Sequence, residues 1–261
     1  MSALKPLVFI TGASSGIGQA LALRYRAAGW RVALVARRAE VLQAWALQQG
    51  WAAGDFHVYA ADVQQVDSIV AAGQRCMADA GLPEVVIANA GISIGMDSTV
   101  REDLAVMQET FATNNVGLAA TFHPFLAAMQ AERRGTLVGI ASVTAIRGLP
   151  GHGAYCASKA AVVAYCESLR GECRPHGVRV VTLLPGYIQT PLTASNTYPM
   201  PFLLTPETFA DRAFRAIEAG TSYRVIPWQM GIVAKLLRLL PNPVFDRLLA
   251  GRGRKKRRGD G

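Results

Sequence analysis

Short apolar runs recur along the chain and alternate with stretches of helical composition. The runs are rich in residues that favour buried strands. They predict strands at residues 7–10, 32–36, 57–61, 85–88, 135–141, 178–184 and 223–227. Strands separated by helices imply βαβ crossovers and a parallel sheet that helices cover on both faces. The pattern therefore predicts an α/β fold in a single doubly wound domain, with a seven-stranded, mostly parallel sheet that binds ligands at the carboxyl ends of its strands.

Length and composition agree with one large domain. The chain has 261 residues, of which 51% are hydrophobic, so it can bury a sizeable core. No linker or low-complexity segment interrupts the alternation before the C-terminus. We expect the domain to cover residues 1–228, followed by an apolar helical extension over 229–250 and a disordered basic tail over 251–261.

A glycine-rich turn follows the first predicted strand and leads into a stretch of helical composition. Glycine permits a tight turn and lets backbone N–H groups approach a pyrophosphate at the start of a helix. Strand, glycine turn and helix form the context that a dinucleotide site requires, although the spacing here is not G-x-G-x-x-G. The alternative is a plain turn between two elements. The residues predicted to contact the cofactor are Gly12, Ser14, Ser15, Gly16, Ile17 and Gly18.

Tyr155 and Lys159 stand four residues apart, and Ser142 lies thirteen residues before the tyrosine. On a helix, residues at this four-residue spacing share a face. A nearby ammonium favours phenolate and lowers the pKa of a tyrosine from about 10. Such a tyrosine can exchange a proton with a substrate oxygen near neutral pH. The alternative is an ordinary tyrosine and an ordinary lysine on a surface helix, since the spacing alone is common.

Together these residues resemble the motifs of the short-chain dehydrogenase/reductase family. Residues 11–18 match T-G-x-x-x-G-x-G, and Ser142, Tyr155 and Lys159 match the catalytic set. The resemblance covers roughly residues 5–225 and implies a Rossmann-type domain. Further matching positions, which the resemblance places at the cofactor, are Asp62, Val63, Asn89, Ala90, Gly91, Pro185, Gly186, Ile188 and Thr190.

The resemblance also implies a fourth catalytic residue and an assembly. The active asparagine of the family corresponds to Asn114, with Asn115 as the alternative, and its backbone would hold a water that connects Lys159 to solvent. Tyr155 and Lys159 would contact the cofactor as well as the substrate. Relatives commonly form homodimers or homotetramers through the helices that correspond to those bearing Asn114 and Tyr155, and we expect the same here.

The end of the second predicted strand indicates which nicotinamide cofactor is bound. An acidic residue there would bind the ribose hydroxyls of NAD, but this chain has Ala36 followed by Arg37 and Arg38. A guanidinium can bind a 2′-phosphate through two hydrogen bonds. The sequence therefore predicts NADP(H), with Arg37 as the main contact. The alternative is that both arginines are solvated surface charges.

The resemblance implies hydride transfer between the nicotinamide and a carbonyl carbon, with Tyr155 as the proton donor. Ser142 and Tyr155 would bind the substrate oxygen, and Lys159 the ribose hydroxyls. We expect a lid over about residues 192–212. Its part from 192 to 204 has no charged residue, which favours a hydrophobic carbonyl or alcohol substrate. Arg147 is the nearby charge that we expect to meet an anionic substrate group.

The C-terminal part is apolar and then strongly basic. Residues 230–240 form an apolar helical stretch that bears Lys235 and Arg238 and is too short to span a membrane. It is expected to pack within the protein or a dimer, or to lie in a membrane interface. Residues 251–261 hold six basic residues and one acid, +5 of the total charge of +9. Weak peripheral contact with anionic membranes is the partner expected of this region, and no specific nucleic acid is.

The remaining patterns narrow the classes of function. The four cysteines form no C-x-x-C pair and no His cluster accompanies them, so we predict no metal site. No signal-peptide pattern opens the chain, and we expect it to be cytoplasmic. The predicted function is an NADP(H)-dependent oxidoreductase that interconverts a carbonyl and a secondary alcohol. The alternatives are a cofactor-binding regulator without turnover, a membrane-associated lipid or acyl ketone reductase, and an isomerase or dehydratase.

Overall fold

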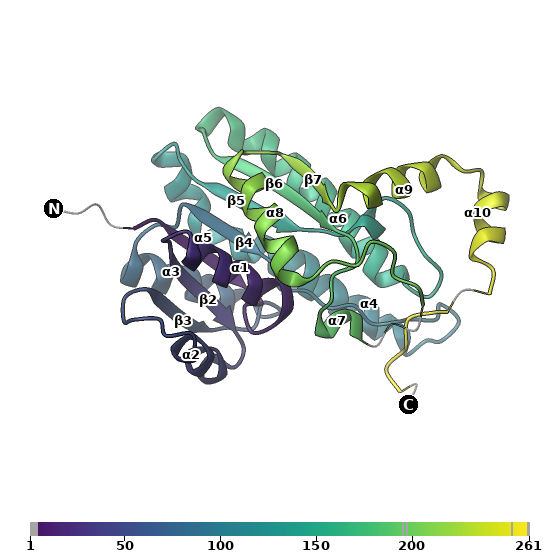
Figure 1. Ribbon diagram of the computed structural model, residues 1–261, viewed down its shortest axis with the longest axis horizontal. Coiled ribbons are helices and arrows are strands. Elements are labelled where there is room, and N and C mark those ends of the chain that lie inside the picture. The colour runs from purple at the N-terminus through teal and green to yellow at the C-terminus, as the bar shows by residue number, and fades with distance from the viewer. Residues whose placement is uncertain (1–4, 195, 197, 252, 260–261) are drawn as a thin grey trace.

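A parallel β-sheet forms the centre of the protein (Figure 1). The computed structural model describes residues 5–194, 196, 198–251 and 253–259. Within these residues the sheet has seven strands in the order β3-β2-β1-β4-β5-β6-β7, and every neighbouring pair is parallel. The strands are β1 (Leu7–Thr11), β2 (Arg31–Ala36), β3 (Phe56–Ala60), β4 (Val85–Ala88), β5 (Thr136–Ile140), β6 (Arg179–Pro185) and β7 (Tyr223–Ile226). The predicted fold class and all seven strand positions are confirmed, and the sheet is parallel throughout.

Helices cover both faces of this sheet. On one face lie α3 (Val66–Ala80), α5 (Gly117–Ala131) and α6 (Gly153–Cys173), and on the other α1 (Gly16–Ala27), α2 (Ala39–Gln48) and α8 (Pro206–Glu218). A π-helical turn, η1 (Ala112–Val116), joins α4 (Asp103–Phe111) to α5. The chain continues after β6 through the short α7 (Pro191–Ala194), and after β7 through α9 (Trp228–Leu239) and α10 (Asn242–Leu249).

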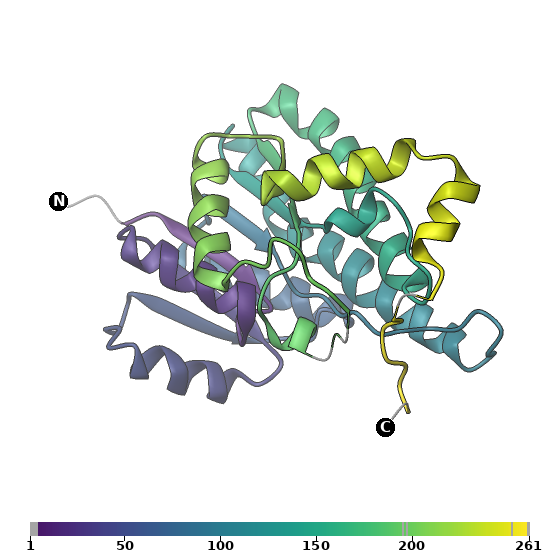
Figure 2. The same cartoon turned by 45° about the vertical axis from the view of Figure 1, so that its right-hand side comes forward.

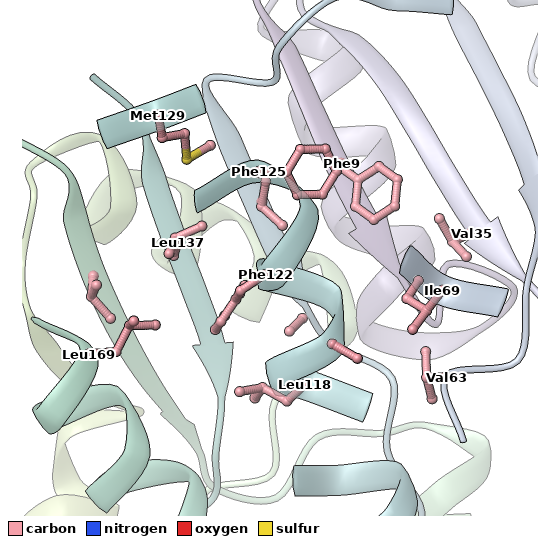
Figure 3. Close-up of a cluster of buried hydrophobic side chains, with 14 of the residues drawn as sticks. Phe9, Val35, Val63, Ile69, Leu118, Phe122, Phe125, Met129, Leu137 and Leu169 are labelled. Carbon is pink, nitrogen blue, oxygen red and sulfur yellow. The ribbon is translucent and has the colours of Figure 1, made fainter. Parts of the chain in front are cut away.

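The two buried clusters follow from the alternation of side chains along each strand. In β1, Phe9 packs towards α5, whereas Val8 and Ile10 pack towards α1. Figure 3 shows Phe9 against Phe125 of α5, with ring centroids 4.9 Å apart. Because both faces are covered, β1 is apolar and buried at nearly every position, which explains why the sequence displays it as an unbroken apolar run.

The strand order reverses at β1, which pairs with β2 on one side and β4 on the other. In open α/β sheets a crevice for ligands opens at the carboxyl ends of the strands at such a point. The residues immediately after β1 and β4 are the glycine turn and Asn89-Ala90-Gly91. The topology alone therefore brings both predicted cofactor segments to one edge of the sheet.

The lid is shorter than the sequence predicted. Helix α8 already begins at Pro206, where the Thr205 hydroxyl accepts a hydrogen bond from the backbone N–H of Thr208. The lid starts and ends beside the tip of β6, because Leu204 donates its N–H to the carbonyl of Tyr187 at 3.0 Å. Positions 195 and 197 of the predicted lid lie outside the described residues.

The C-terminal segment differs from the predicted disordered tail. After α10 the chain turns back, and residues 253–259 run along the body past α7 and α4 (Figure 2). Acidic side chains on the body pair with this segment, as described below. Residues 252, 260 and 261 of the predicted tail lie outside the described residues. None of the described helices is long and apolar enough to cross a membrane.

Candidate active site

The turn after β1 is built around glycines that leave no room for side chains. Gly12 has a φ of +65°, and a Cβ there would lie 2.8 Å from the Cα of Ala90. A Cβ on Gly18 would lie 2.2 Å from the carbonyl oxygen of Gly12. Larger residues would push the start of α1 away from the strand, so these glycines keep the helix N-terminus close to the sheet edge.

Asn89 braces this glycine turn from the neighbouring strand. Its Nδ2 donates to the carbonyls of Thr11 and Gly12, at 3.0 and 3.1 Å. The Thr11 hydroxyl in turn accepts from the N–H groups of Asn89 and Ala90, at 3.1 and 3.3 Å. Asn89, predicted as a cofactor contact, therefore acts on the cofactor site through the shape of the turn.

The start of α1 is suited to a pyrophosphate. Ser15 precedes the helix in an extended conformation, and the first turn holds no acidic residue. Ser15 is exposed, while Ser14, Gly16 and Ile17 are half-buried at the same edge. The free N–H groups and the dipole of a helix N-terminus favour an anion here. This cradle fits the phosphates of a dinucleotide.

The residues predicted to bind the adenosine half of the cofactor lie at the ends of β2 and β3. Arg37 and Arg38 follow β2 and are exposed, and within the described residues neither guanidinium has an ion pair or hydrogen bond. Asp62, predicted at the adenine edge, accepts the N–H of Gln64 at 3.0 Å and so shapes the turn after β3. Val63 is buried, and a Cβ on Gly117 would lie 2.7 Å from the Val63 carbonyl oxygen.

Helix α6 places Tyr155 and Lys159 on one face beside the end of β5. The Lys159 ammonium lies 5.8 Å from the centroid of the Tyr155 ring and donates to the carbonyl of Ile140 at 2.9 Å. Lys159 is only 5% exposed. Burial disfavours the charged form and lowers the pKa of Lys159 to about 8.

The Tyr155 phenol differs from the sequence-based expectation of a lowered pKa. Burial raises the pKa of Tyr155 to about 12, and a hydrogen bond with the Ser142 side chain opposes this rise. The removal of water from the phenol is the largest influence on this pKa, and it exceeds the opposing hydrogen bond with Ser142. Tyr155 is therefore protonated near neutral pH and is ready to donate.

Ser142 lies two residues after β5 and faces the same phenol. Its Oγ accepts hydrogen bonds from the N–H and the hydroxyl of Thr144, at 3.3 and 3.0 Å. With its lone pairs engaged by Thr144, the Ser142 hydroxyl proton is directed to other acceptors. The structure thus brings together Ser142, Tyr155 and Lys159, which the sequence singled out.

Asn114 lies in the π-helical turn η1 next to Lys159. Its Nδ2 donates to the Ile92 carbonyl and to Ser158 Oγ, and its Oδ1 accepts from the Ile92 N–H at 2.9 Å. A Cβ on Gly91 would lie 3.1 Å from Asn114 Oδ1 and 3.4 Å from Lys159 Nζ. Asn115 instead donates to the Ser158 carbonyl at 2.9 Å. The geometry therefore places Asn114, rather than Asn115, beside the lysine.

The predicted nicotinamide segment follows β6. Pro185 ends that strand, Gly186 donates its N–H to the Ile226 carbonyl at 2.8 Å, and Ile188 is buried. Thr190 lies across from the glycine turn, since a Cβ on Gly16 would lie 3.0 Å from its Cγ2. The two ends of the predicted cofactor site therefore meet at the crevice.

A small cavity lies near the N-terminus of α6, the helix that bears Tyr155 and Lys159. Its lining comes from the loop after β5, the lid, α10 and the C-terminal segment, through Leu149, Pro150, His152, Tyr198, Leu249 and Gly253. His152 is buried, and its Nε2 lies 3.2 Å from the Tyr198 hydroxyl. The sequence patterns give no signal for Leu249 or Gly253, because both come from segments far along the chain from the loop after β5.

Arg147 does not serve the role expected of it. Its guanidinium donates to the carbonyls of Leu237, Arg238 and Leu240 at the end of α9, and it lies over the Phe245 ring with 3.8 Å between Cζ and the ring centroid. A cation at a helix C-terminus satisfies the last carbonyls and the helix dipole. Arg147 thus fixes α9 to α10, and its guanidinium is engaged by these structural contacts.

Comparisons with known proteins agree with this site. The family model described as short chain dehydrogenase matches residues 6–200. An uncharacterized oxidoreductase of Myxococcus xanthus is 37% identical over 91% of this chain and 93% of its own length. Dehydrogenase/reductase SDR family member 7B of Bos taurus is 32% identical over 97% of this chain and 82% of its own length.

A solved structure agrees as well. The 3-ketoacyl-(acyl-carrier-protein) reductase of Brucella melitensis, complexed with NADH, has a TM-score of 0.75 at 26% identity, over 86% of this chain and 96% of that chain. The match of the family model extends over most of the chain and includes the glycine turn and the Tyr155–Lys159 helix. The chain therefore belongs to the short-chain dehydrogenase/reductase family of NAD(P)(H)-dependent oxidoreductases.

Proposed function

We propose that the protein uses NADP(H) to interconvert a carbonyl and a secondary alcohol on a hydrophobic substrate. The observation that carries this proposal is the position of Ser142, Tyr155 and Lys159. All three lie at the end of β5, and Tyr155 and Lys159 lie on the helix that follows His152, which lines the cavity. A cofactor held along the crevice would meet a substrate in the cavity at these side chains.

The residues of the chain would handle the proton and the charge, while the nicotinamide supplies the hydride. Ser142 donates a hydrogen bond to the substrate oxygen, supported by the Thr144 hydroxyl behind it. Tyr155 donates its proton to the same oxygen as negative charge develops there. Lys159 binds the ribose hydroxyls and, as a cation, stabilises the phenolate that remains.

The proton that Tyr155 gives up would return from solvent past Asn114 to Lys159, and from Lys159 to the phenolate. A π-helical turn interrupts the regular pairing of backbone groups in a helix, and such turns are frequent at functional sites. The turn η1 contains Asn114 beside the buried ammonium. We infer that a backbone carbonyl of this turn holds a water that restores the proton of Lys159. The Asn114 side chain, already bonded to Ile92 and Ser158, fixes the turn in place.

The choice of NADP(H) over NAD(H) rests on Arg37. Its guanidinium is exposed at the tip of β2, next to Ala36, and no carboxylate stands at that tip to repel a 2′-phosphate. Arg38 follows it and precedes α2. A bidentate guanidinium–phosphate contact would add affinity that a cofactor lacking this phosphate does not gain.

The substrate would be hydrophobic. The cavity lining is largely apolar, and the Brucella relative reduces 3-ketoacyl groups carried by a protein. Acyl thioesters and long-chain ketones are therefore the first compounds to screen. A cofactor-binding regulator without turnover is the competing class, and an intact Ser142–Tyr155–Lys159 set argues against it.

We also propose that α9 rests on anionic membranes. Its outward stripe consists of Trp228, Ile232, Leu236 and Leu239, each at least half exposed, and Lys235 lies within this stripe. Apolar side chains with interspersed cations suit an anionic lipid surface. A second copy packed on the stripe about a twofold axis would set Lys235 near its own copy, which disfavours that occupant. The basic residues after α10 contribute less than the sequence suggested, because they pair with carboxylates of the body.

Replacing Tyr155 by Phe removes the proton donor and leaves the ring. We expect turnover of a reactive ketone to fall by about 10²- to 10⁴-fold, while the Kd for NADPH changes little. Steady-state kinetics and NADPH fluorescence measure the two quantities. Tyr165→Phe, on the same helix but outside the site, is the matched control and should keep the wild-type rate. If Tyr155→Phe keeps the rate of the wild type, the assignment of Tyr155 as proton donor is refuted. If the wild-type protein turns over no compound of a broad carbonyl panel, the cofactor-binding regulator is favoured.

The lowered pKa of Lys159 predicts a descending limb in the pH profile of kcat/KM. Lys159 is charged below about pH 8 and neutral above it, whereas Tyr155, with a pKa of about 12, stays protonated. We expect kcat/KM for NADPH, which reports the free enzyme, to fall as the pH rises through about 8. Lys159→Arg cannot lose its charge in this range, so its residual activity should lack the limb. A limb that persists in Lys159→Arg would exclude Lys159 as its source.

Arg37→Ala tests the cofactor preference. We expect the Kd for NADPH to rise about 10- to 100-fold and the Kd for NADH to stay the same, because the lost hydrogen bonds are charge-assisted and reach only the 2′-phosphate. Isothermal titration with both cofactors measures the difference, and Arg38→Ala should show a smaller effect of the same sign. Equal weakening towards both cofactors would contradict the proposal.

Vesicle co-sedimentation tests the α9 surface. The wild-type protein should bind vesicles of phosphatidylcholine with 30% phosphatidylserine, and raised salt should weaken binding about tenfold. Ile232→Ser with Leu236→Ser should abolish binding. Leu47→Ser with Leu104→Ser, also on exposed helix surfaces, is the control and should bind like wild type. The proposal is overturned if the wild-type protein does not bind these vesicles. It is also overturned if light scattering shows that the α9 variant shifts from dimer to monomer.

A further inference from the structure

We propose that residues 253–258, here named the C-terminal strap, form the outer wall of the substrate pocket, and that Lys255 is a positioning residue that holds the lid closed. This inference rests on the proposed function for the identity of the pocket. Figure 2 shows the strap running below α10 and beside α7. It crosses the carboxyl-end side of the sheet and contacts the loops that follow β4, β5 and β6.

Ion pairs anchor the strap to α4 and the loop before it. Arg257 meets Asp103 through two contacts, with Nε–Oδ2 at 2.7 Å and Nη2–Oδ1 at 3.2 Å. Asp103 is only 4% exposed. Arg258 lies 2.7 Å from Glu109, and Arg254 lies 3.5 Å from Asp97. A bidentate guanidinium–carboxylate contact on a buried acid fixes direction as well as position, which separates this anchor from scattered surface pairs.

The strap also fits a backbone seat that requires glycine. The N–H of Gly95 donates to the Lys256 carbonyl at 3.0 Å, and Gly95 forms a parallel bridge with Arg257. A Cβ on Gly95 would lie 2.1 Å from the Lys255 carbonyl oxygen. At Gly151, where φ is +75°, a Cβ would lie 3.0 Å from the Arg254 Cβ. Two glycines in loops after different strands thus make room for the same segment, which chance contact would not explain.

Lys255 connects the strap to the lid. Its side chain is buried, at 8% exposure, and Nζ donates to the Leu192 carbonyl at 2.7 Å and to Asn196 Oδ1 at 2.9 Å. Both acceptors are neutral groups of the lid. Moving these acceptors away would leave a buried ammonium without hydrogen bonds, which is strongly unfavourable. The lid segment is therefore held where its two oxygens face Lys255.

Holding the lid in this place sets the substrate pocket. Tyr198, farther along the lid, faces His152, the residue that immediately precedes α6. Both side chains line the cavity together with Gly253 of the strap. The strap therefore joins the loops that follow β4, β5 and β6 into one closed rim. Loss of this rim should affect how substrate is held, while the crevice for the cofactor lies at the other end of the site.

Lys255→Met is the direct test, because it keeps the length and apolar stem of the side chain and removes the charged donor. Hydrogen exchange of residues 187–194 and 198–204 should become about tenfold faster in this variant. KM for a hydrophobic ketone should rise about tenfold, while kcat changes less and the Kd for NADPH stays within about twofold of the wild type. Lys256→Met, the exposed neighbour, is the matched control and should behave like wild type.

Arg257→Met provides a second route to the same state, because it releases the anchor without touching the lid. It should raise lid exchange and KM in the same direction. Wild-type lid exchange in Lys255→Met, or a rise in KM that Lys256→Met reproduces, would overturn the proposal. The exchange measurement needs no turnover, so the strap can be refuted or supported even if the carbonyl panel shows no activity and the proposed function fails.

Discussion

Lys159 holds its amine at the buried end of β5, and the arrangement around it depends on keeping that amine in place. Charge at a site with so little water costs free energy unless fixed dipoles replace the solvent. The Ile140 carbonyl supplies one such dipole, and Asn114, tied to Ile92 and Ser158, packs beside the ammonium. The Lys159 ammonium thereby fixes the relative positions of β5, α6 and the turn η1. The same helix, α6, also positions the phenol of Tyr155.

The cofactor end and the substrate end of the site are encoded differently. The cofactor end is largely contiguous, because residues 11–18 form the turn and the start of α1, and Asn89 adds one brace from β4. The proposed substrate end is assembled from the lid, the loop after β5, α10 and the C-terminal strap. A short stretch of sequence therefore reveals the family and its chemistry. The shape of the proposed substrate pocket depends on contacts between segments that lie far apart in the chain.

This difference explains what the sequence could predict. The strands were found because residues buried on both faces give unbroken apolar runs, and the Tyr155–Lys159 spacing defined a helix face. Local composition predicts a disordered basic tail, because it shows the charges of this segment but not Asp103 and Glu109. These two carboxylates lie about 150 residues away in the chain and pair with the tail. The raised pKa of Tyr155 was missed for the same reason, since burial comes from the packed structure.

Isotope transfer tests the central claim, hydride movement from the nicotinamide to a substrate held at Tyr155, most directly. The enzyme is incubated with NADPH carrying deuterium on either face of C4 and with a ketone that the screen identifies, and the alcohol is analysed by mass spectrometry. The account predicts one deuterium in the product from one face of the cofactor and none from the other, because the crevice holds the ring in one orientation. Product without deuterium from either labelled cofactor would contradict it.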